Sequence, residues 1–432
     1  MGQGIGRWFG GITTIAVIGG ALALAACGQG GGTAAKPDTT YQEKLIQQLI
    51  DAKPGDVITI PAGVYAIDRG LSLDADGVTI RGAGMDKTIL SFKGQTAGAE
   101  GLLVNASNFT IEDLALEDAK GDALKVNEGE NIIIRRVRAE WTGGPKTSNG
   151  AYGLYPVQVR NLLIEDSVAI GASDAGIYVG QSQNVVVRRN RAEFNVAGIE
   201  IENTQTADVY DNLATNNTGG ILVFNMPNLK VPGFGARVFR NRVVGNNTGN
   251  FGRKGTAVAS VPAGTGVIVN SNDKVEIFDN EIGGNNTANV ILSSFFSAGY
   301  KAGEGMAPTF DPYPESIFVH DNRFSPGGGK PDGMDLQALR VALFGVTGAL
   351  PDVVWDGYVD TKKFVGGKPD PALGLCVDNG AAKVLNGDGP NKYKAPKLVE
   401  LKCRLAPLPA ASVAFAGAVP AESQIPAAGK PK

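Results

Sequence analysis

Three short stretches set the fold: Gly176-Ile-Tyr-Val-Gly180, Gly198-Ile-Glu-Ile-Glu202 and Gly220-Ile-Leu-Val-Phe224, each 22 residues after the one before. The same pattern recurs around three further positions, Gly153, Gly266 and Asn289. Apolar-x-apolar segments lie between these stretches, so each repeat holds three short strands. A period of 22 to 23 residues with this content is typical of a parallel β-helix, whereas propeller blades need about 40 residues and leucine-rich repeats need a leucine signature that is missing here.

The composition agrees with a repeated coil and limits the chemistry. The chain has 432 residues with 60 Gly, one His and a net charge of −3. Glycine at roughly twice its average use, without a G-X-Y period, indicates many tight corners rather than collagen. The single histidine, His320, excludes a multi-histidine metal site, and the near-neutral charge argues against a nucleic-acid partner.

Alternation along the first strand of each coil predicts which side chains face the core. We expect one inner row of Leu124, Leu154, Ile177, Ile199, Ile221, Val267 and Val290. We expect one outward row of Lys125, Tyr155, Tyr178, Glu200, Leu222, Ile268 and Ile291, and a second of Asn127, Val157, Gly180, Glu202, Phe224, Asn270 and Ser293. Asp122, Tyr152 and Asp174 stand just before these strands.

Asparagines recur at one place in successive coils. They are Asn190, Asn212, Asn241, Asn280 and Asn322. Asparagine tolerates the left-handed conformation of a tight corner, and stacked amides can bond from coil to coil. We therefore predict an internal ladder rather than a sugar-binding row.

The amino end predicts export. Residues Trp8 to Ala26 are apolar or small and follow Arg7, as in a secretory signal, so we assign residues 1–26 as a signal peptide. Leu24-Ala25-Ala26-Cys27 resembles the lipobox of bacterial lipoproteins, in which the cysteine carries the lipid. Gly28 stands where an inner-membrane lipoprotein commonly has Asp, so the resemblance implies the outer membrane. The alternative is a chance cysteine in a transmembrane helix, but the stretch is short and glycine-rich.

The remaining regions follow from these assignments. Residues 27–38 are a polar linker, and residues 39–325 are the β-helix with an N-terminal capping helix from Tyr41 to Ala52. Residues 326–404 are a C-terminal capping region with a helix at 334–344, and residues 405–432 are a disordered Ala- and Pro-rich tail. Cys376 and Cys403 are predicted to form a disulfide, because the exported chain meets an oxidising compartment.

Residues 40 to 325 resemble right-handed parallel β-helix proteins, the superfamily of pectate lyases, polygalacturonases and mannuronan C5-epimerases. The runs 149–158, 173–182 and 197–203, with Gly374-Leu-Cys-Val-Asp-Asn379, resemble a bacterial lipoprotein branch named for its repeat rather than for an activity. The Asp-Pro-His-Asp motif of the epimerases is absent, and Leu154-Tyr155-Pro156-Val157 takes its place. The resemblance implies the fold and leaves the reaction open.

Insertions on both sides of the first strand column predict a groove over it. Its aromatic and basic side chains suit a sugar chain, because rings stack on sugars and cations pair with uronate carboxylates. The predicted substrate-binding residues are Tyr152, Phe224, Arg253, Lys254 and Tyr300.

Two kinds of catalysis are open for this groove. A polyuronate lyase or epimerase would use Tyr155 and Tyr178 as acid and base and Lys125 to neutralise the sugar carboxylate. An inverting glycosidase would use Glu200 and Glu202, with Asp174 as a third carboxylate. The alternative function is a noncatalytic envelope component that binds a glycan or a partner. No metal site or cofactor is predicted, and a bound Ca²⁺ is left open.

Overall fold

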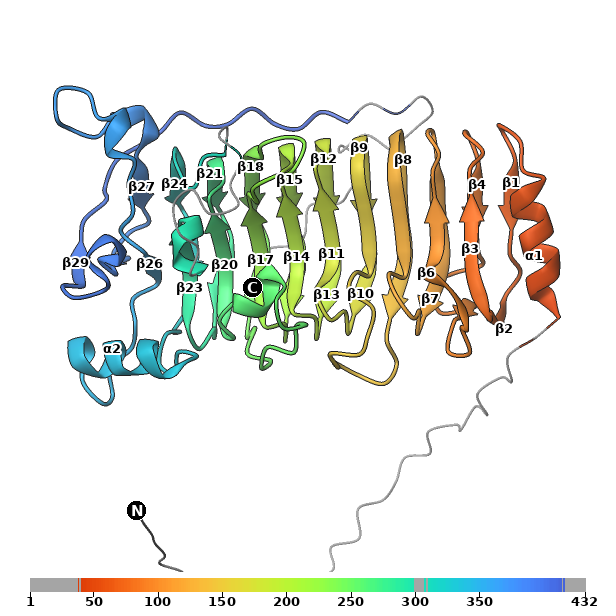
Figure 1. Cartoon of the computed structure of the whole chain (residues 1–432), viewed down its shortest axis with the longest axis horizontal. Coiled ribbons are helices and arrows are strands. Elements are labelled where there is room, and N and C mark those ends of the chain that lie inside the picture. Colours follow the sequence, from red (N-terminus) through yellow and green to blue (C-terminus); the bar gives the residue numbers. More distant parts are fainter. Residues whose placement is uncertain (1–37, 39, 299–306, 308–309, 414, 416–432) are drawn as a thin grey trace, which may run out of the picture. The chain divides into compact units, whose positions relative to one another are not determined.

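The computed structural model describes residues 38, 40–298, 307, 310–413 and 415. All of them belong to the compact unit Lys36–Lys432. Its strands stack along one axis, as Figure 1 shows; helix α1 (Tyr41–Ile50) lies at one end of the stack, and helix α2 (Met334–Phe344) lies below the strands at the other end. The predicted signal peptide and Cys27 lie outside the described residues. Within the described part of the chain, no helix has the length and apolarity needed to cross a membrane.

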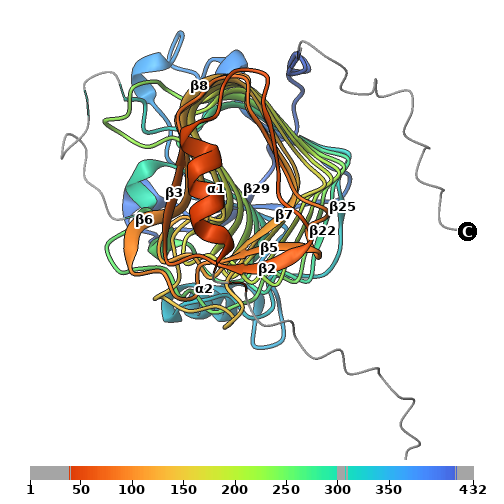
Figure 2. The ribbon, with the colours of Figure 1, turned by 90° about the vertical axis from the view of Figure 1, so that its right-hand side faces the viewer.

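Three parallel ladders form the walls of each coil, and β7, β8 and β9 bend through corners to serve more than one ladder. The first ladder contains β3 (Arg69–Leu73), β6 (Ala97–Val104), β8 (Leu124–Glu140), β9 (Leu154–Glu165), β11 (Ala175–Gly180), β14 (Ala197–Glu202), β17 (Gly219–Phe224), β20 (Thr265–Asn270), β23 (Ala288–Ser293), β26 (Val353–Trp355) and β28 (Val384–Asn386). The second adds β1 (Val57–Thr59), β4 (Thr79–Arg81), β7 (Thr110–Glu117), β12 (Gln183–Arg188), β15 (Gln205–Tyr210), β18 (Phe234–Phe239), β21 (Asp273–Phe278), β24 (Ile317–His320) and β27 (Leu375–Asp378). The third adds β2 (Gly63–Ala66), β5 (Thr88–Ser91), β10 (Val168–Ile170), β13 (Arg191–Glu193), β16 (Leu213–Thr215), β19 (Arg242–Val244), β22 (Glu281–Gly283) and β25 (Arg323–Phe324). This architecture is the predicted parallel β-helix, and Figure 2 shows the coils superimposed along its axis behind α1.

The core lies inside the coils, and the predicted inner row is confirmed. Leu154 pairs in register with Ile177, Ile177 with Ile199, and the row continues to Val290 through Ile221 and Val267. All of these side chains are fully buried. The N-terminal end of this core is covered by α1, which packs Leu45 and Leu49 onto it.

The predicted asparagine ladder is also confirmed. The Asn241 side-chain oxygen accepts hydrogen bonds from the backbone and side chain of Asn212, and its own amide donates to Asn280 at 3.0 Å. The row extends to Asn379, beyond the predicted members. A second ladder follows at another corner, with members Asn195, Asn217, Asn246 and Asn285.

The C-terminal region adds strands to the solenoid. β26 pairs in parallel with β23, and β27 pairs with β24, so the ladders continue past residue 325 into the region predicted as a cap. The disulfide between Cys376 and Cys403 is confirmed, and it ties β27 to the segment that follows β29 (Lys397–Val399). Part of the tail predicted to be disordered then runs back along the second ladder, where the Ser412 amide donates to Asn184 (Figure 1).

Candidate active site

The outward rows of the first ladder lie in the predicted register. Lys125 pairs with Tyr155, Tyr178 with Glu200, and Glu200 with Leu222. In the second outward row Glu202 pairs with Phe224. These side chains therefore stand beside one another on the outer face of the coils, at the spacing of adjacent strands.

The insertion at residues 250–264 folds over most of this face. Its Phe251, Val258 and Val261 pack with Leu222, Phe224 and Ile268 in one apolar cluster outside the coils. Phe224 is only 6% exposed as a result, and Glu200 is 3% exposed. The apolar cluster fills the face over β17 and β20.

A pocket of about 330 Å³ remains open beside this cluster, on the side of the earlier coils. Asp122, Tyr152 and Asp174 line it from the coils, and Arg253 and Thr256 line it from the insertion. The Tyr152 backbone N–H donates to Asp122 at 3.2 Å, and the Asp174 N–H donates to the Ala151 carbonyl. The pocket thus joins three successive coils with the insertion.

Both pocket carboxyl groups are shifted toward the neutral form. Burial raises the pKa of Asp122 to about 6, and the hydrogen bond from Tyr152 and the charge of Lys125 only partly oppose this. Burial, with the nearby carboxylates of Glu202 and Asp122, raises the pKa of Asp174 to about 7. A pair of acids whose pKa values lie near neutrality and differ from each other is suited to acid–base catalysis.

Glu200 and Glu202 lie next to this pocket, behind the residues that line it. The Tyr178 hydroxyl donates to Glu202 at 2.6 Å. Burial raises the pKa of both acids, most strongly that of Glu200, which also faces Asp174. One Glu200 oxygen, Oε2, is buried and has no hydrogen-bond partner in the described part of the chain.

The three tyrosines form a tight aromatic group. The ring centroid of Tyr152 lies 4.4 Å from that of Tyr155 and 4.6 Å from that of Tyr178. Burial and the surrounding carboxylates raise the pKa of each phenol, for Tyr155 to about 12. The phenols therefore stay protonated at neutral pH and act as hydrogen-bond donors.

The other predicted site residues are distributed around this centre. The Lys125 ammonium lies 3.8 Å from Glu100 and 5.3 Å from the Tyr155 ring centroid. Lys254 is exposed on the insertion and does not line the pocket, and Tyr300 lies outside the described residues. Asp122 lines the pocket but is not among the catalytic residues that the sequence predicts. Its signal was its position two residues before the inner Leu124, as Tyr152 precedes Leu154.

A separate acidic group could hold a metal ion. Side-chain oxygens of Asp273, Asp311 and Glu315 lie within 4.8 Å of one another. The Lys363 ammonium donates to Asp311 and Glu315, so it already supplies a positive charge there. His320 is far from the candidate site in the fold, because it ends β24 of the second ladder and contacts Glu276 and Asp321.

Comparisons with known proteins support the fold. Residues 76–233 match the family model described as the right-handed β-helix region. No curated protein sequence gives a significant match. The A-module of the mannuronan C-5 epimerase AlgE4 from Azotobacter vinelandii is 19% identical over 80% of this chain and 91% of its own, with a TM-score of 0.50.

Two further structures show similar coverage. The A-module of AlgE6 from the same organism is 18% identical over 80% of this chain and 90% of its own, with a TM-score of 0.48. A PL6 alginate lyase solved with a trisaccharide is 13% identical over 81% of this chain and 83% of its own, with a TM-score of 0.42. The match of residues 76–233 to the right-handed β-helix model and the parallel ladders together identify the solenoid as a right-handed parallel β-helix.

Proposed function

We propose that this protein is a carbohydrate-active enzyme that hydrolyses a glycosidic bond of a polysaccharide, with inversion, in the pocket between Asp122 and Asp174. The observation that carries the proposal is one open pocket that holds two carboxyl groups with pKa values of about 6 and about 7. The general fold agrees, since the epimerases and the lyase to which the chain is similar are polysaccharide enzymes by their names.

The spacing of the two acids favours inversion. Asp122 is in register with Tyr152, and Asp174 lies on the next coil. Two steps of the ladder place their Cα atoms roughly 10 Å apart. The ~6.5–9.5 Å between the carboxyl groups of inverting glycosidases can be reached from this Cα spacing with little tilt of the side chains, whereas the roughly 5 Å of retaining enzymes would require both side chains to lean toward each other.

The neighbouring charges assign the roles. Glu202 and Asp122 favour the protonated form of Asp174, which is the general acid and gives its proton to the leaving glycosidic oxygen as the C–O bond breaks. The charge of Lys125 favours the ionised form of Asp122, which is the general base and takes a proton from the water that bonds to the anomeric carbon. Activity is then greatest between the two pKa values, at slightly acidic pH.

The tyrosine-based lyase or epimerase hypothesis is less favoured by the electrostatics. A tyrosine base must lose its proton, and burial beside carboxylates raises the pKa of Tyr152, Tyr155 and Tyr178 instead of lowering it. Lys125, the predicted carboxylate neutraliser, lies beside Glu100. Arg253 and Lys120, which also line the pocket, carry the positive charges that would bind the carboxylate of an acidic sugar.

The test is turnover of a panel of neutral and uronate polysaccharides, measured as new reducing ends. We expect Asp122→Asn and Asp174→Asn to lower the rate about 1,000-fold. The matched control Asp113→Asn changes an acid paired with Arg136 at the corner between the second and third ladders and should keep the rate. Anomeric NMR signals should show inversion. Products that absorb as unsaturated uronates would instead identify a lyase, and binding without turnover would identify a noncatalytic glycan-binding component.

We also propose that the protein is exported and held by a lipid on Cys27 at the outer membrane. The sequence Leu24-Ala25-Ala26-Cys27 and the disulfide between Cys376 and Cys403 support this location. Cys27→Ser should move the protein from the membrane fraction to the soluble fraction. Membrane association that survives this change would refute lipid anchoring.

A further inference from the structure

Helix α2 presents apolar side chains to solvent instead of to the core. Met334, Ala338, Val341 and Ala342 follow one another at helical spacing along one face, and all four are exposed. Met334 is 89% exposed, and the face continues into Val346, which follows the helix and is 78% exposed. We call these five residues the α2 face. A run of exposed apolar side chains of this kind marks a surface that binds a partner.

The polar side of α2 is turned inward and satisfied within the chain. Arg340 is the buried residue of the helix, and its guanidinium donates to the Val346 carbonyl at 2.9 Å and to the Gln337 side chain at 3.1 Å. Asp335, in the first turn, is the exposed charge of the helix. Among the described residues, no side chain of α2 joins an apolar core cluster. The core of the solenoid therefore does not explain why the α2 face is apolar.

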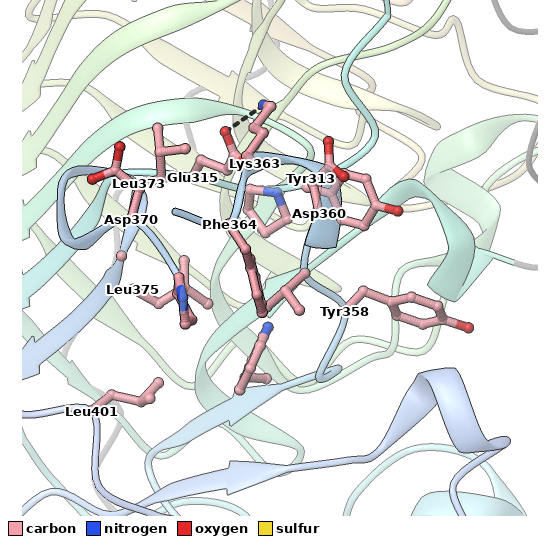
Figure 3. Close-up of a pocket in the computed structure, with 15 residues that line it drawn as sticks. Tyr313, Glu315, Tyr358, Asp360, Lys363, Phe364, Asp370, Leu373, Leu375 and Leu401 are labelled. Atoms are coloured by element: carbon pink, nitrogen blue, oxygen red, sulfur yellow. Dashed lines mark hydrogen bonds and ion pairs between the residues drawn. The ribbon is translucent and has the colours of Figure 1, made fainter. Parts of the chain in front are cut away.

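Other apolar side chains of the C-terminal region are partly covered by the chain itself. Figure 3 shows the pocket that Leu373, Leu375 and Leu401 line together with Phe364. Each of these four side chains is half-buried. The α2 face lacks such cover.

Both ends of α2 are held in place by hydrogen bonds. The Asp332 N–H donates to the Thr287 hydroxyl at 2.8 Å, and the Asp332 carboxylate accepts from the Ala263 N–H at 2.9 Å. After the helix, the Leu350 N–H donates to the Gly328 carbonyl at 2.9 Å. The α2 face therefore has a defined place at the corner that joins the third ladder to the first, since β25 precedes it and β26 follows it.

The N-terminal part of the chain enters the solenoid at the same corner. Asp38 pairs with Tyr65 of β2, and its carbonyl accepts from the Ala66 N–H at 2.9 Å, just before the chain turns into β3. Figures 1 and 2 show β2 and α2 on the same side of the solenoid. The chain from Cys27 to Asp38 reaches at most ~40 Å. A lipid on Cys27 thus holds this edge of the solenoid close to the bilayer.

We propose that the α2 face docks on the lipid bilayer as a second membrane contact, and this rests on the proposed lipid anchor at Cys27. Nine pairings of the first ladder lead from β3 to β26, which places α2 about 43 Å along the axis from the point of entry, at ~4.8 Å per step. Two contacts this far apart hold the solenoid with its axis parallel to the bilayer. Asp122 and Asp174 directly follow the same corner in their coils, so the pocket is held close to the membrane surface.

The size of the α2 face favours a bilayer over a second copy of the chain. A helix of 11 residues is about 16 Å long and exposes a strip about 10 Å wide, so the face offers roughly 160 Å². A stable dimer buries about 800 Å² on each partner. A small apolar face suffices at a membrane, because a lipid anchor needs only a second, weaker contact beside it.

Fluorescence quenching by brominated lipids tests the proposal. The full chain carrying Val341→Trp is bound to vesicles of phosphatidylethanolamine and phosphatidylglycerol, with or without bromine on the acyl chains. We expect bromine to lower the fluorescence about twofold, because an interfacial helix buries its apolar face ~5–10 Å deep. Trp141 and Trp355 are buried and supply a constant background. The matched control Leu229→Trp replaces a side chain of similar exposure in the loop between β17 and β18, at another corner, and should not be quenched.

Vesicle-bound protein whose Val341→Trp fluorescence is unchanged by bromine, or is quenched no more than that of Leu229→Trp, would overturn the proposal. If Val341→Trp fails to fold, Val346→Trp replaces it with the same reading. A dimer in light scattering that Val341→Lys dissociates would assign the α2 face to a second copy of the chain and overturn the proposal as well.

The lipid anchor is read separately, by the fractionation of Cys27→Ser. A chain that stays on the vesicles without quenching refutes docking by the α2 face and leaves the anchor standing. A chain that does not bind the vesicles refutes docking, and Cys27→Ser then shows whether the anchor fails with it.

Discussion

Replacing Asp174 by Asn should abolish activity and yet stabilise the protein at alkaline pH. The Asp174 carboxyl has a pKa of about 7 in the folded chain against an ordinary value of 3.8. The folded state therefore holds a proton that the unfolded state has released between these values, and stability falls as pH rises through this window. About three pKa units correspond to about 4 kcal/mol for an isolated group. Because the carboxyl faces an open pocket, we expect about half of this, ~2 kcal/mol.

Urea unfolding of the wild type and Asp174→Asn at two pH values measures this effect. At about pH 8 the variant should be more stable by ~2 kcal/mol. At about pH 4.5 the difference should fall to less than half of this, and it should vanish only below pH 3.8, where the carboxyl is neutral in the unfolded chain as well. Turnover should be lost at both pH values.

Asp113→Asn is the matched control with the opposite sign. Arg136 holds the pKa of Asp113 below its ordinary value through hydrogen bonds of 2.6 and 2.8 Å. Its removal should cost about 1 kcal/mol at alkaline pH and leave turnover intact. If Asp174→Asn instead destabilises the protein at about pH 8, or retains turnover, Asp174 is a structural residue and the assignment of the general acid is wrong.

Three further changes have definite expectations. Asn241→Ala removes a buried link of the asparagine ladder and should cost ~2–4 kcal/mol in urea unfolding, whereas Asn247→Ala at an exposed corner should cost about 0.5 kcal/mol; equal losses would contradict the ladder's role. Replacing Cys376 and Cys403 by Ser opens a 27-residue loop and should cost about 3 kcal/mol, which a reducing agent should reproduce in the wild type. Tyr152→Phe removes a hydrogen bond that lowers the pKa of Asp174, so the alkaline limb of the pH–rate profile should move to higher pH. An unchanged alkaline limb would show that Tyr152 does not influence the pKa of the general acid.

The positions of the buried side chains could be predicted from the sequence because each of them is determined by two regular spacings. The two-residue alternation within a strand and the repeat of 22 to 23 residues between coils together assign one position to each buried side chain. This is why Leu154, Ile177 and Ile199 were placed in one inner row, and why Asn212 and Asn241 were placed in one ladder. Both predictions depend only on spacing, and spacing is preserved wherever coils have equal length.

The outer face could not be read in the same way, because insertions interrupt the repeat. The sequence predicts insertions on both sides of the first ladder, but nothing in its composition indicates that Val258 and Val261 cover Leu222 and Phe224. The site was therefore expected as an open groove along the whole column. It is instead a pocket at the edge of that cover, where Asp122 becomes a lining residue.

The three acids Asp174, Glu200 and Glu202 differ from the other carboxylates on the outer faces of the solenoid, and this contrast is the strongest physical argument that the acid cluster serves function. On the second ladder Glu165 lies beside Arg188, and the guanidinium donates to it at 2.9 Å. On the first ladder Asp174, Glu200 and Glu202 gather on neighbouring coils, and no Arg or Lys of the described residues forms an ion pair with them. Stacked like charges destabilise a sheet. An arginine on the neighbouring coil pairs with Glu165, so the fold can accommodate such a pair at the spacing of adjacent strands. Without a cation beside them, Asp174, Glu200 and Glu202 lower the stability of the folded chain. A loss of stability of this kind is expected at a site that uses protonated carboxyl groups for catalysis.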